Sequence, residues 1–124
     1  MPDQITVTRW DRTDPPNESE LYFLMEQLGY APTLRGRPPG TRRTAHRHSY
    51  PEMTWVVSGW VRYEFPSATD GGEPRVEVLE GGDRIEVPPD VPHTTIVEGA
   101  AYAVYLSSSP WTLPLAPAPA NVNV

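Results

Sequence analysis

The chain has 124 residues, a net charge of -6 and 38% hydrophobic residues, which suits one globular domain with its own core. Cysteine is absent and all 10 basic residues are arginine, which excludes thiolate nucleophiles and Schiff-base chemistry through lysine. The net negative charge argues against nonspecific binding to nucleic acid. No apolar run is long enough for a membrane span, and the first residues do not resemble a secretory signal, so we expect a cytoplasmic protein.

The N-terminal part predicts one strand and one helix. Residues 5–10 (ITVTRW) alternate between polar and apolar side chains, as a strand does. Residues 17–29 predict a helix, because one apolar face recurs at helical spacing: Leu21, Leu24, Met25 and Leu28. Asn17 and Glu20 form a potential capping box, and Gly29 stands where a glycine ends many helices. We expect this helix to pack against the domain without a chemical role.

Short apolar segments separated by glycine and proline fill the rest of the domain. The chain contains 16 prolines and 9 glycines, which favour brief strands over long helices. Segments rich in β-branched and aromatic residues predict strands at 53–58, 60–65, 75–79, 84–87, 94–97 and 102–106. Their spacing of about ten residues is typical of an all-β sandwich or barrel. We expect one domain over residues 1–110 with its barrel core at 40–106, then a Pro/Ala-rich extended tail at 111–124.

Two of the chain's 3 histidines lie in the stretch AHRHSYPE, at positions 46 and 48. Side chains two residues apart share a face of a strand, so His46 and His48 can both reach one metal ion at about 2.0–2.1 Å. Residues 49–51 predict a bend that returns Glu52 at the head of the next strand, close enough to supply an oxygen ligand. His93 is the remaining candidate for a further ligand.

The same residues carry a family resemblance. The first signature motif of the cupin superfamily is similar to the segment Gly40-x5-His46-x-His48-x3-Glu52-x6-Gly59. The second motif resembles the segment Gly82-x5-Pro88-x-Asp90-x2-His93. Asp90 stands where the family usually has glycine, and aspartate tolerates the positive φ that such a turn can need. The resemblance implies a cupin double-stranded β-helix (jelly-roll) barrel with one N-terminal helix, and a metal bound by His46, His48, Glu52 and His93.

Three imidazoles and one carboxylate suit one divalent transition metal per chain, and they leave positions open for water, oxygen or substrate. Ligand type alone does not separate Fe, Mn, Ni, Cu, Co and Zn. The alternative is that the imidazoles are exposed or core side chains without a metal, and that Glu52 pairs with Arg47 or Arg62.

Strand parity predicts the pocket beside this site. Arg42 shares a face with His46 if no bulge intervenes, which makes it a candidate anchor for a substrate carboxylate or phosphate; the alternative is a solvated surface arginine. Val97 replaces the closing asparagine of the second cupin motif, so we expect a more apolar pocket wall. The expected lining residues are Tyr50, Thr54, Val56, Tyr63, Thr95 and Val97.

The cupin resemblance covers dioxygenases, decarboxylases, isomerases, lyases and polyketide cyclases. It therefore implies a metal-dependent enzyme, and we favour oxygenase-type chemistry on a small aromatic or carboxylated molecule, with Glu52 as a candidate base. The alternative is a non-catalytic binding or sensor module that acts through a partner protein. Small cupins commonly dimerise, so we expect a homodimer formed by packed sheet faces or by exchange of residues 5–10.

Overall fold

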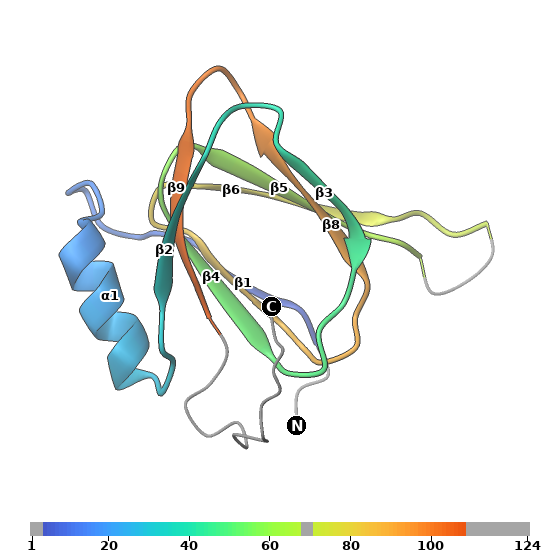
Figure 1. Ribbon diagram of the computed structural model, residues 1–124, viewed down its shortest axis with the longest axis horizontal. Helices are drawn as coiled ribbons and strands as arrows, with labels where there is room; N and C mark the ends of the chain where they lie inside the picture. The colour runs from blue at the N-terminus through green and yellow to red at the C-terminus, as the bar shows by residue number, and fades with distance from the viewer. Residues whose placement is uncertain (1–3, 68–70, 109–124) are drawn as a thin grey trace.

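The computed structural model describes residues 4–67 and 71–108, whose strands form two antiparallel sheets around a shared core (Figure 1). The first sheet has the order β1 (Thr6–Thr8), β7 (Arg84–Val87), β4 (Glu52–Ser58), β9 (Ala103–Ser108) and β2 (Thr33–Arg37). The second has the order β3 (Arg42–His46), β8 (His93–Glu98), β5 (Trp60–Phe65) and β6 (Arg75–Glu80). This confirms the expected all-β jelly-roll architecture, with one helix, α1 (Glu18–Gln27), in the described part of the chain.

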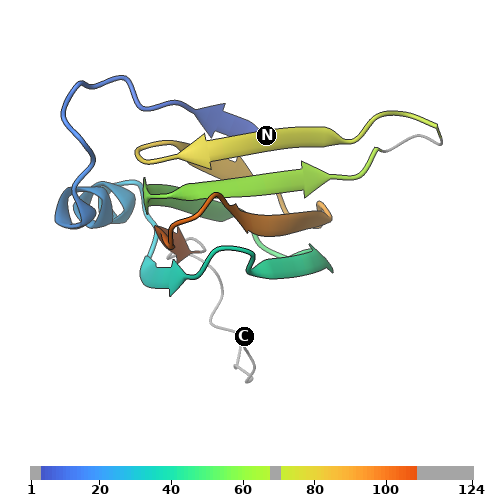
Figure 2. The same ribbon diagram turned by 90° about the horizontal axis from the view of Figure 1, so that it is seen from above.

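The two sheets present their edge strands β2 and β3 on the same side of the molecule (Figure 2). Within the described ranges, β2 pairs only with β9, and β3 pairs only with β8. The turn between them is fastened to β8, because the Gly40 amide donates to the Val97 carbonyl and the Val97 amide donates to the Thr41 carbonyl. Two neighbouring edge strands therefore border the interior here.

Alternation along β4 separates two apolar clusters on opposite faces of its sheet. Val56 faces the interior and belongs to a core made by both sheets, with Val61, Tyr63, Phe65, Leu79, Ile85, Val87, Val97 and Ala103. Met53 and Trp55 face outward and pack under α1 together with Leu21, Met25 and Leu106. Each fully buried aliphatic side chain contributes about 1.5–3 kcal/mol relative to exposure, so the helix is held chiefly by this outer cluster.

The helix begins and ends close to its predicted limits. The Asn17 side chain caps it by accepting a hydrogen bond from the Glu20 amide at 3.1 Å, and Gly29 follows its end with a φ of 91°. Its buried face is narrower than the apolar spacing predicts, because Leu21 and Met25 are buried while Leu28 is 49% exposed. Along the described ranges, no helix combines the length and apolar character needed to cross a membrane.

The residues before the helix are fastened to the turn that precedes β7. Asp83, which is buried, accepts hydrogen bonds from the Trp10 amide at 2.9 Å and from Arg9 at 3.0 Å. The Trp10 ring lies directly against Gly82, where an added Cβ would overlap it. The short strand β1 pairs with β7 of its own chain.

The predicted strands from residue 53 onward are all present, and their ends coincide with the prediction or differ from it by at most two residues. The strand β2 was not expected, because its sequence TLRGR has neither a strong run of β-branched residues nor clear alternation. The predicted tail at 111–124 lies outside the described residues.

Candidate metal centre

The three histidines meet at the end of the β3–β8 ladder. His46 ends β3 and lies directly opposite His93, the first residue of β8, and their ring centroids are 4.3 Å apart. His48 joins them from the turn after β3, with its ring centroid 5.2 Å from that of His46. One ring nitrogen from each of the three lies within 4.8 Å of the others, so all three imidazoles converge on one point.

Backbone carbonyls set the tautomers of two of these rings. Nδ1 of His46 lies 2.9 Å from the Thr44 carbonyl oxygen, and Nδ1 of His93 lies 2.9 Å from the Val91 carbonyl oxygen. A carbonyl only accepts, so Nδ1 carries the proton in each neutral ring and Nε2 keeps a lone pair. The Nε2 atoms of His93 and His48 are buried and have no hydrogen-bond partner among the described residues. Such buried unpaired ring nitrogens are costly unless a further group binds them.

Glu52, the first residue of β4, completes the group. Its Oε2 lies 3.5 Å from Nε2 of His48 and its Oε1 lies 3.6 Å from Nε2 of His93. Burial on its own raises the pKa of Glu52, but the close approach of His93 and the charges of the nearby histidines outweigh it, and the pKa lies below its ordinary value of 4.5. A carboxylate with a low pKa is a weak general base and a ready metal ligand.

Burial also prepares the imidazoles for a metal. It lowers the pKa of His46 and of His48 below the ordinary value of 6.5, and in His48 it outweighs the opposing charge of Glu52. Both rings are therefore neutral at pH 7, which is the form that binds metal ions. Unpaired buried nitrogens, a fixed tautomer and one carboxylate together fit a divalent first-row transition ion. We call His46, His48, His93 and Glu52 the histidine–glutamate cluster.

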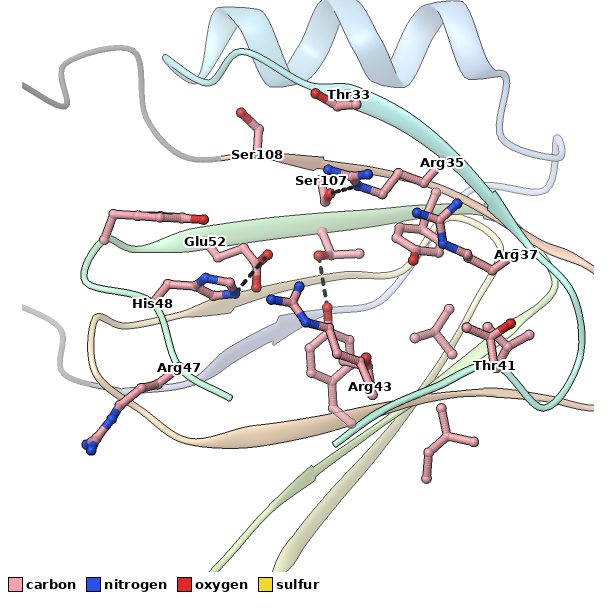
Figure 3. Close-up of a pocket in the computed structure, with 18 of the residues that line it drawn as sticks. Thr33, Arg35, Arg37, Thr41, Arg43, Arg47, His48, Glu52, Ser107 and Ser108 are labelled. Carbon is pink, nitrogen blue, oxygen red and sulfur yellow. Dashed lines mark hydrogen bonds and ion pairs between the residues drawn. The ribbon is translucent and has the colours of Figure 1, made fainter. Parts of the chain in front are cut away.

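The cluster borders a cavity of 870 Å³ between the two sheets, and His48 and Glu52 lie among its lining residues (Figure 3). Five expected pocket residues line this cavity: Tyr50, Thr54, Tyr63, Thr95 and Val97. Val56 does not line it, because its side chain faces the core and is 0% exposed. Tyr63 donates a hydrogen bond to the Thr54 hydroxyl at 2.9 Å and stacks on His93 with ring centroids 5.7 Å apart.

The expected alignment of Arg42 with His46 does not hold. The β3–β8 ladder pairs Arg43 with Thr95 but His46 with His93, so one extra residue is inserted on β3 between them. This bulge reverses the parity of the strand, and Arg43 instead of Arg42 lines the cavity. Sequence reasoning also missed Arg35 and Arg37 on β2, although their spacing of two residues would have placed them on one face of a strand.

Comparison with known families settles what the fold and the motif spacing indicate. The family model described as Cupin domain matches residues 35–109. The chain belongs to the cupin family. That span includes both edge strands of the cavity and every member of the histidine–glutamate cluster. A comparison with proteins of curated function gave no match.

Solved structures resemble this cupin in fold. CENP-C of Drosophila melanogaster bound to CAL1 has a TM-score of 0.55 at 17% identity, covering 62% of this chain and 59% of that chain. Bacillus subtilis oxalate decarboxylase, in a structure concerned with its Mn(II) centres, has a TM-score of 0.56 at 25% identity, covering 66% and 22%. Peruvianin-I, a cysteine peptidase from Thevetia peruviana latex, has a TM-score of 0.54 at 23% identity, covering 68% and 53%. This cupin therefore spans less than two thirds of each of these chains.

Proposed function

We propose that this cupin is a metal-dependent enzyme that binds a small carboxylic acid beside a transition metal ion and reacts it with dioxygen. One observation carries the proposal: the histidine–glutamate cluster, with two buried Nε2 atoms that have no hydrogen-bond partner among the described residues, borders a cavity of 870 Å³. That volume lies within the range of about 300–1,000 Å³ that is typical of small-molecule sites. His46, His48, His93 and Glu52 are the proposed ligands.

Arg43 is the proposed anchor for the substrate carboxylate. It extends from β3 into the cavity, near His48 and Glu52 (Figure 3), and it forms no ion pair with any carboxylate of the described residues. A guanidinium group binds a carboxylate through two parallel hydrogen bonds, which fixes both position and orientation. Arg43 thus takes the role that the sequence suggested for Arg42.

The remaining lining residues supply the rest of the pocket. Val61 and Val97 offer an apolar wall for the hydrocarbon or aromatic part of a substrate, and the Tyr63 hydroxyl is held by Thr54. When bound, a redox-active ion supplies Lewis acidity and one-electron chemistry with dioxygen. Fe and Mn are the first ions to test, and the Mn(II) centres named for the oxalate decarboxylase support the second choice.

Oxygen uptake tests this function. We expect protein loaded with Fe(II) or Mn(II) to consume oxygen with at least one member of a panel of phenolic, enolic and keto acids. Uptake should stop in His48→Ala and fall by about tenfold to a hundredfold in Arg43→Gln, because a charged hydrogen-bond partner is lost. Lack of oxygen uptake across the panel contradicts the oxygenase proposal, and release of CO2 without oxygen uptake would assign a decarboxylase instead.

A second candidate is a non-catalytic module that acts through a partner protein. It is favoured by exposed apolar side chains on the helix, where Tyr22 is 40%, Phe23 57% and Leu28 49% exposed. Exposed apolar side chains of this kind, on the helix and at its C-cap, suit a protein partner or a second copy of the chain in a homodimer. Light scattering of the purified protein identifies a dimer, and a stoichiometric partner that co-purifies, together with absence of turnover, would favour the module.

A further inference from the structure

The arginines of this cupin divide into two groups. Five form an ion pair with a carboxylate within 4.0 Å: Arg9, Arg12, Arg62, Arg75 and Arg84. The other five have no carboxylate partner among the described residues, and four of them line the cavity: Arg35, Arg37, Arg43 and Arg47. A shortage of acids does not explain this, because the chain has 16 acidic residues against 10 arginines. Uncompensated positive charge is therefore concentrated at the cavity of an acidic protein.

Two of these arginines form one wall. Arg35 and Arg37, which we call the distal arginine pair, lie two residues apart on the edge strand β2, and both side chains leave the same face. Nε of Arg35 donates to the Ser107 hydroxyl at 3.2 Å, which orients its guanidinium group. In Figure 3 the pair extends into the cavity from β2, Arg43 extends from β3, and Arg47 points away.

The sheet register separates the distal arginine pair from the histidine–glutamate cluster. Arg35 pairs with Tyr105 on β9, and Tyr105 pairs with Val56 on β4. At the backbone, Val56 lies four residues after Glu52, about 13 Å along the strand at about 3.3 Å per residue. The guanidinium group of Arg35 leans back toward the cluster, because its Nε donates to Ser107, which pairs with Thr54, two residues or about 7 Å after Glu52. Arg43, in contrast, pairs with Thr95, two residues from His93. Positive charge therefore lies at two places in one cavity, one beside the cluster and one further along the sheet.

The wall between these places carries little negative charge. Glu52 is the one acidic side chain among the lining residues, and it already interacts with His48 and His93. A ligand with a single carboxylate at Arg43 would leave the distal arginine pair without a counter-charge. A guanidinium pair that is oriented and free of acids is suited to bind a carboxylate or phosphate group.

We propose that the substrate is a dianion with its two anionic groups at opposite ends. This rests on the proposed function: one group is bound by Arg43 beside the histidine–glutamate cluster, and the other is bound by the distal arginine pair. The separation along the sheet requires a molecule longer than oxalate, whose two carboxyl groups are directly bonded. The apolar wall at Val61 and Val97 would contact the chain that joins the two groups.

Calorimetric titration of the full chain loaded with Mn(II) tests the distal subsite. The probes are straight-chain dicarboxylates from oxalate to adipate, the monocarboxylates of equal carbon number, and a phosphonocarboxylate that separates a preference for phosphate from one for carboxylate. We expect one long dianion of either kind to bind at least about tenfold more tightly than its matched monocarboxylate. Oxalate should show no such dependence on the distal arginine pair.

Variants of the distal arginine pair complete the test. Arg35→Gln and Arg37→Gln should each remove most of the dianion's advantage and change monocarboxylate binding by less than about twofold. Arg42→Gln is the matched control, because it removes the same charge from the neighbouring strand but does not line the cavity. Equal binding of dianions and monocarboxylates by the wild type, an advantage that survives in both variants, or an equal loss in Arg42→Gln overturns the proposal. The titration measures binding without turnover. A negative result in the oxygen-uptake assay would therefore not change the outcome of this binding test.

Discussion

Tyr63 joins the core to the candidate metal centre. Its ring is 3% exposed and stacks on His93, and its hydroxyl donates to Thr54. Burial raises the pKa of Tyr63 well above its ordinary value of 10.0, and the nearby Glu52 carboxylate acts in the same direction. The phenol therefore stays protonated at any physiological pH and acts as a hydrogen-bond donor, never as a base.

Tyr63→Phe should separate the hydroxyl from the ring. We expect a loss of about 1 kcal/mol in the free energy of unfolding, because the buried hydrogen bond to Thr54 is lost, while metal content stays unchanged because the ring still packs on His93. Urea denaturation and metal analysis measure the two effects. Thr54→Val serves as the partner control: the double variant should be less destabilised than the sum of the single variants. Loss of metal in Tyr63→Phe would contradict this account.

His48→Ala should abolish metal binding at the histidine–glutamate cluster. His48 contributes a buried Nε2 without a hydrogen-bond partner, and the variant leaves two imidazoles and one carboxylate to hold the ion. We expect one equivalent of a transition metal in the wild type by mass spectrometry and a small fraction of that in the variant. Arg47→Ala, in the same exposed turn, is the control and should retain its metal. Equal metal content in His48→Ala would show that the ion binds elsewhere.

The sequence predicted that the histidines converge, but it did not predict what orients them. The spacing of His46 and His48, together with the second cupin motif at His93, was enough to expect a cluster. The carbonyl groups of Thr44 and Val91 that set the ring tautomers depend on local backbone bends. Backbone carbonyl positions leave no signature in residue identity, so this part of the site requires coordinates.

Among the strands, those rich in β-branched and aromatic residues were predicted from the sequence, and β2, which is poor in such residues, was not. The strands β4 and β5 are rich in valine and aromatic residues, and both were expected within a residue of their limits. The strand β2 contains a glycine and two arginines, so its own sequence gives little preference for a strand. Hydrogen bonding with β9 holds it in the extended conformation. The bulge in β3 escaped prediction for a related reason, since an inserted residue changes parity without any required residue type.

Gly82→Ala should detach the segment before the helix. Gly82 has a φ of 94°, and an added Cβ would overlap the Trp10 ring. We expect the free energy of unfolding to fall by about 2–4 kcal/mol, because alanine is strained in the left-handed region and because the Trp10 ring is displaced. The change in Trp10 environment is measured by tryptophan fluorescence and the stability by urea denaturation.

Gly29→Ala is the matched control for this element. Its φ of 91° carries the same backbone cost, but no atom lies within 4 Å of the added Cβ. We expect the free energy of unfolding to fall by about 1–2 kcal/mol without a change in Trp10 fluorescence. If the two variants were equally destabilised, contact between Gly82 and Trp10 would contribute nothing measurable to stability.

At the scale of the whole molecule, the net charge and the charge distribution give different information. A net charge of -6 argues against a basic binding surface for the protein as a whole, but it does not reveal the arginines that gather around the cavity. Composition averages over positions, whereas the cavity is made by strands far apart in the sequence. The cupin motifs predicted the barrel, yet the charge of its interior depends on which residues of β2 and β3 face inward.

Acid should destabilise the metal-free protein in a defined pH window. Burial places the pKa values of His46 and His48 below 6.5 in the folded state, so protonation favours the unfolded chain, where these pKa values are ordinary. Stability is therefore full above about pH 6.5 and decreases as the pH falls from there toward the folded pKa values. Glu52 does not contribute in this window, because its pKa lies below 4.5. We expect the Tm of EDTA-treated protein to fall as the pH decreases from about 6.5 to 5, and to fall less steeply in His48→Gln, which removes one of the two rings whose pKa burial lowers. A flat Tm across this range would show that the imidazoles have their ordinary pKa values in the folded protein and do not need a metal to compensate for burial.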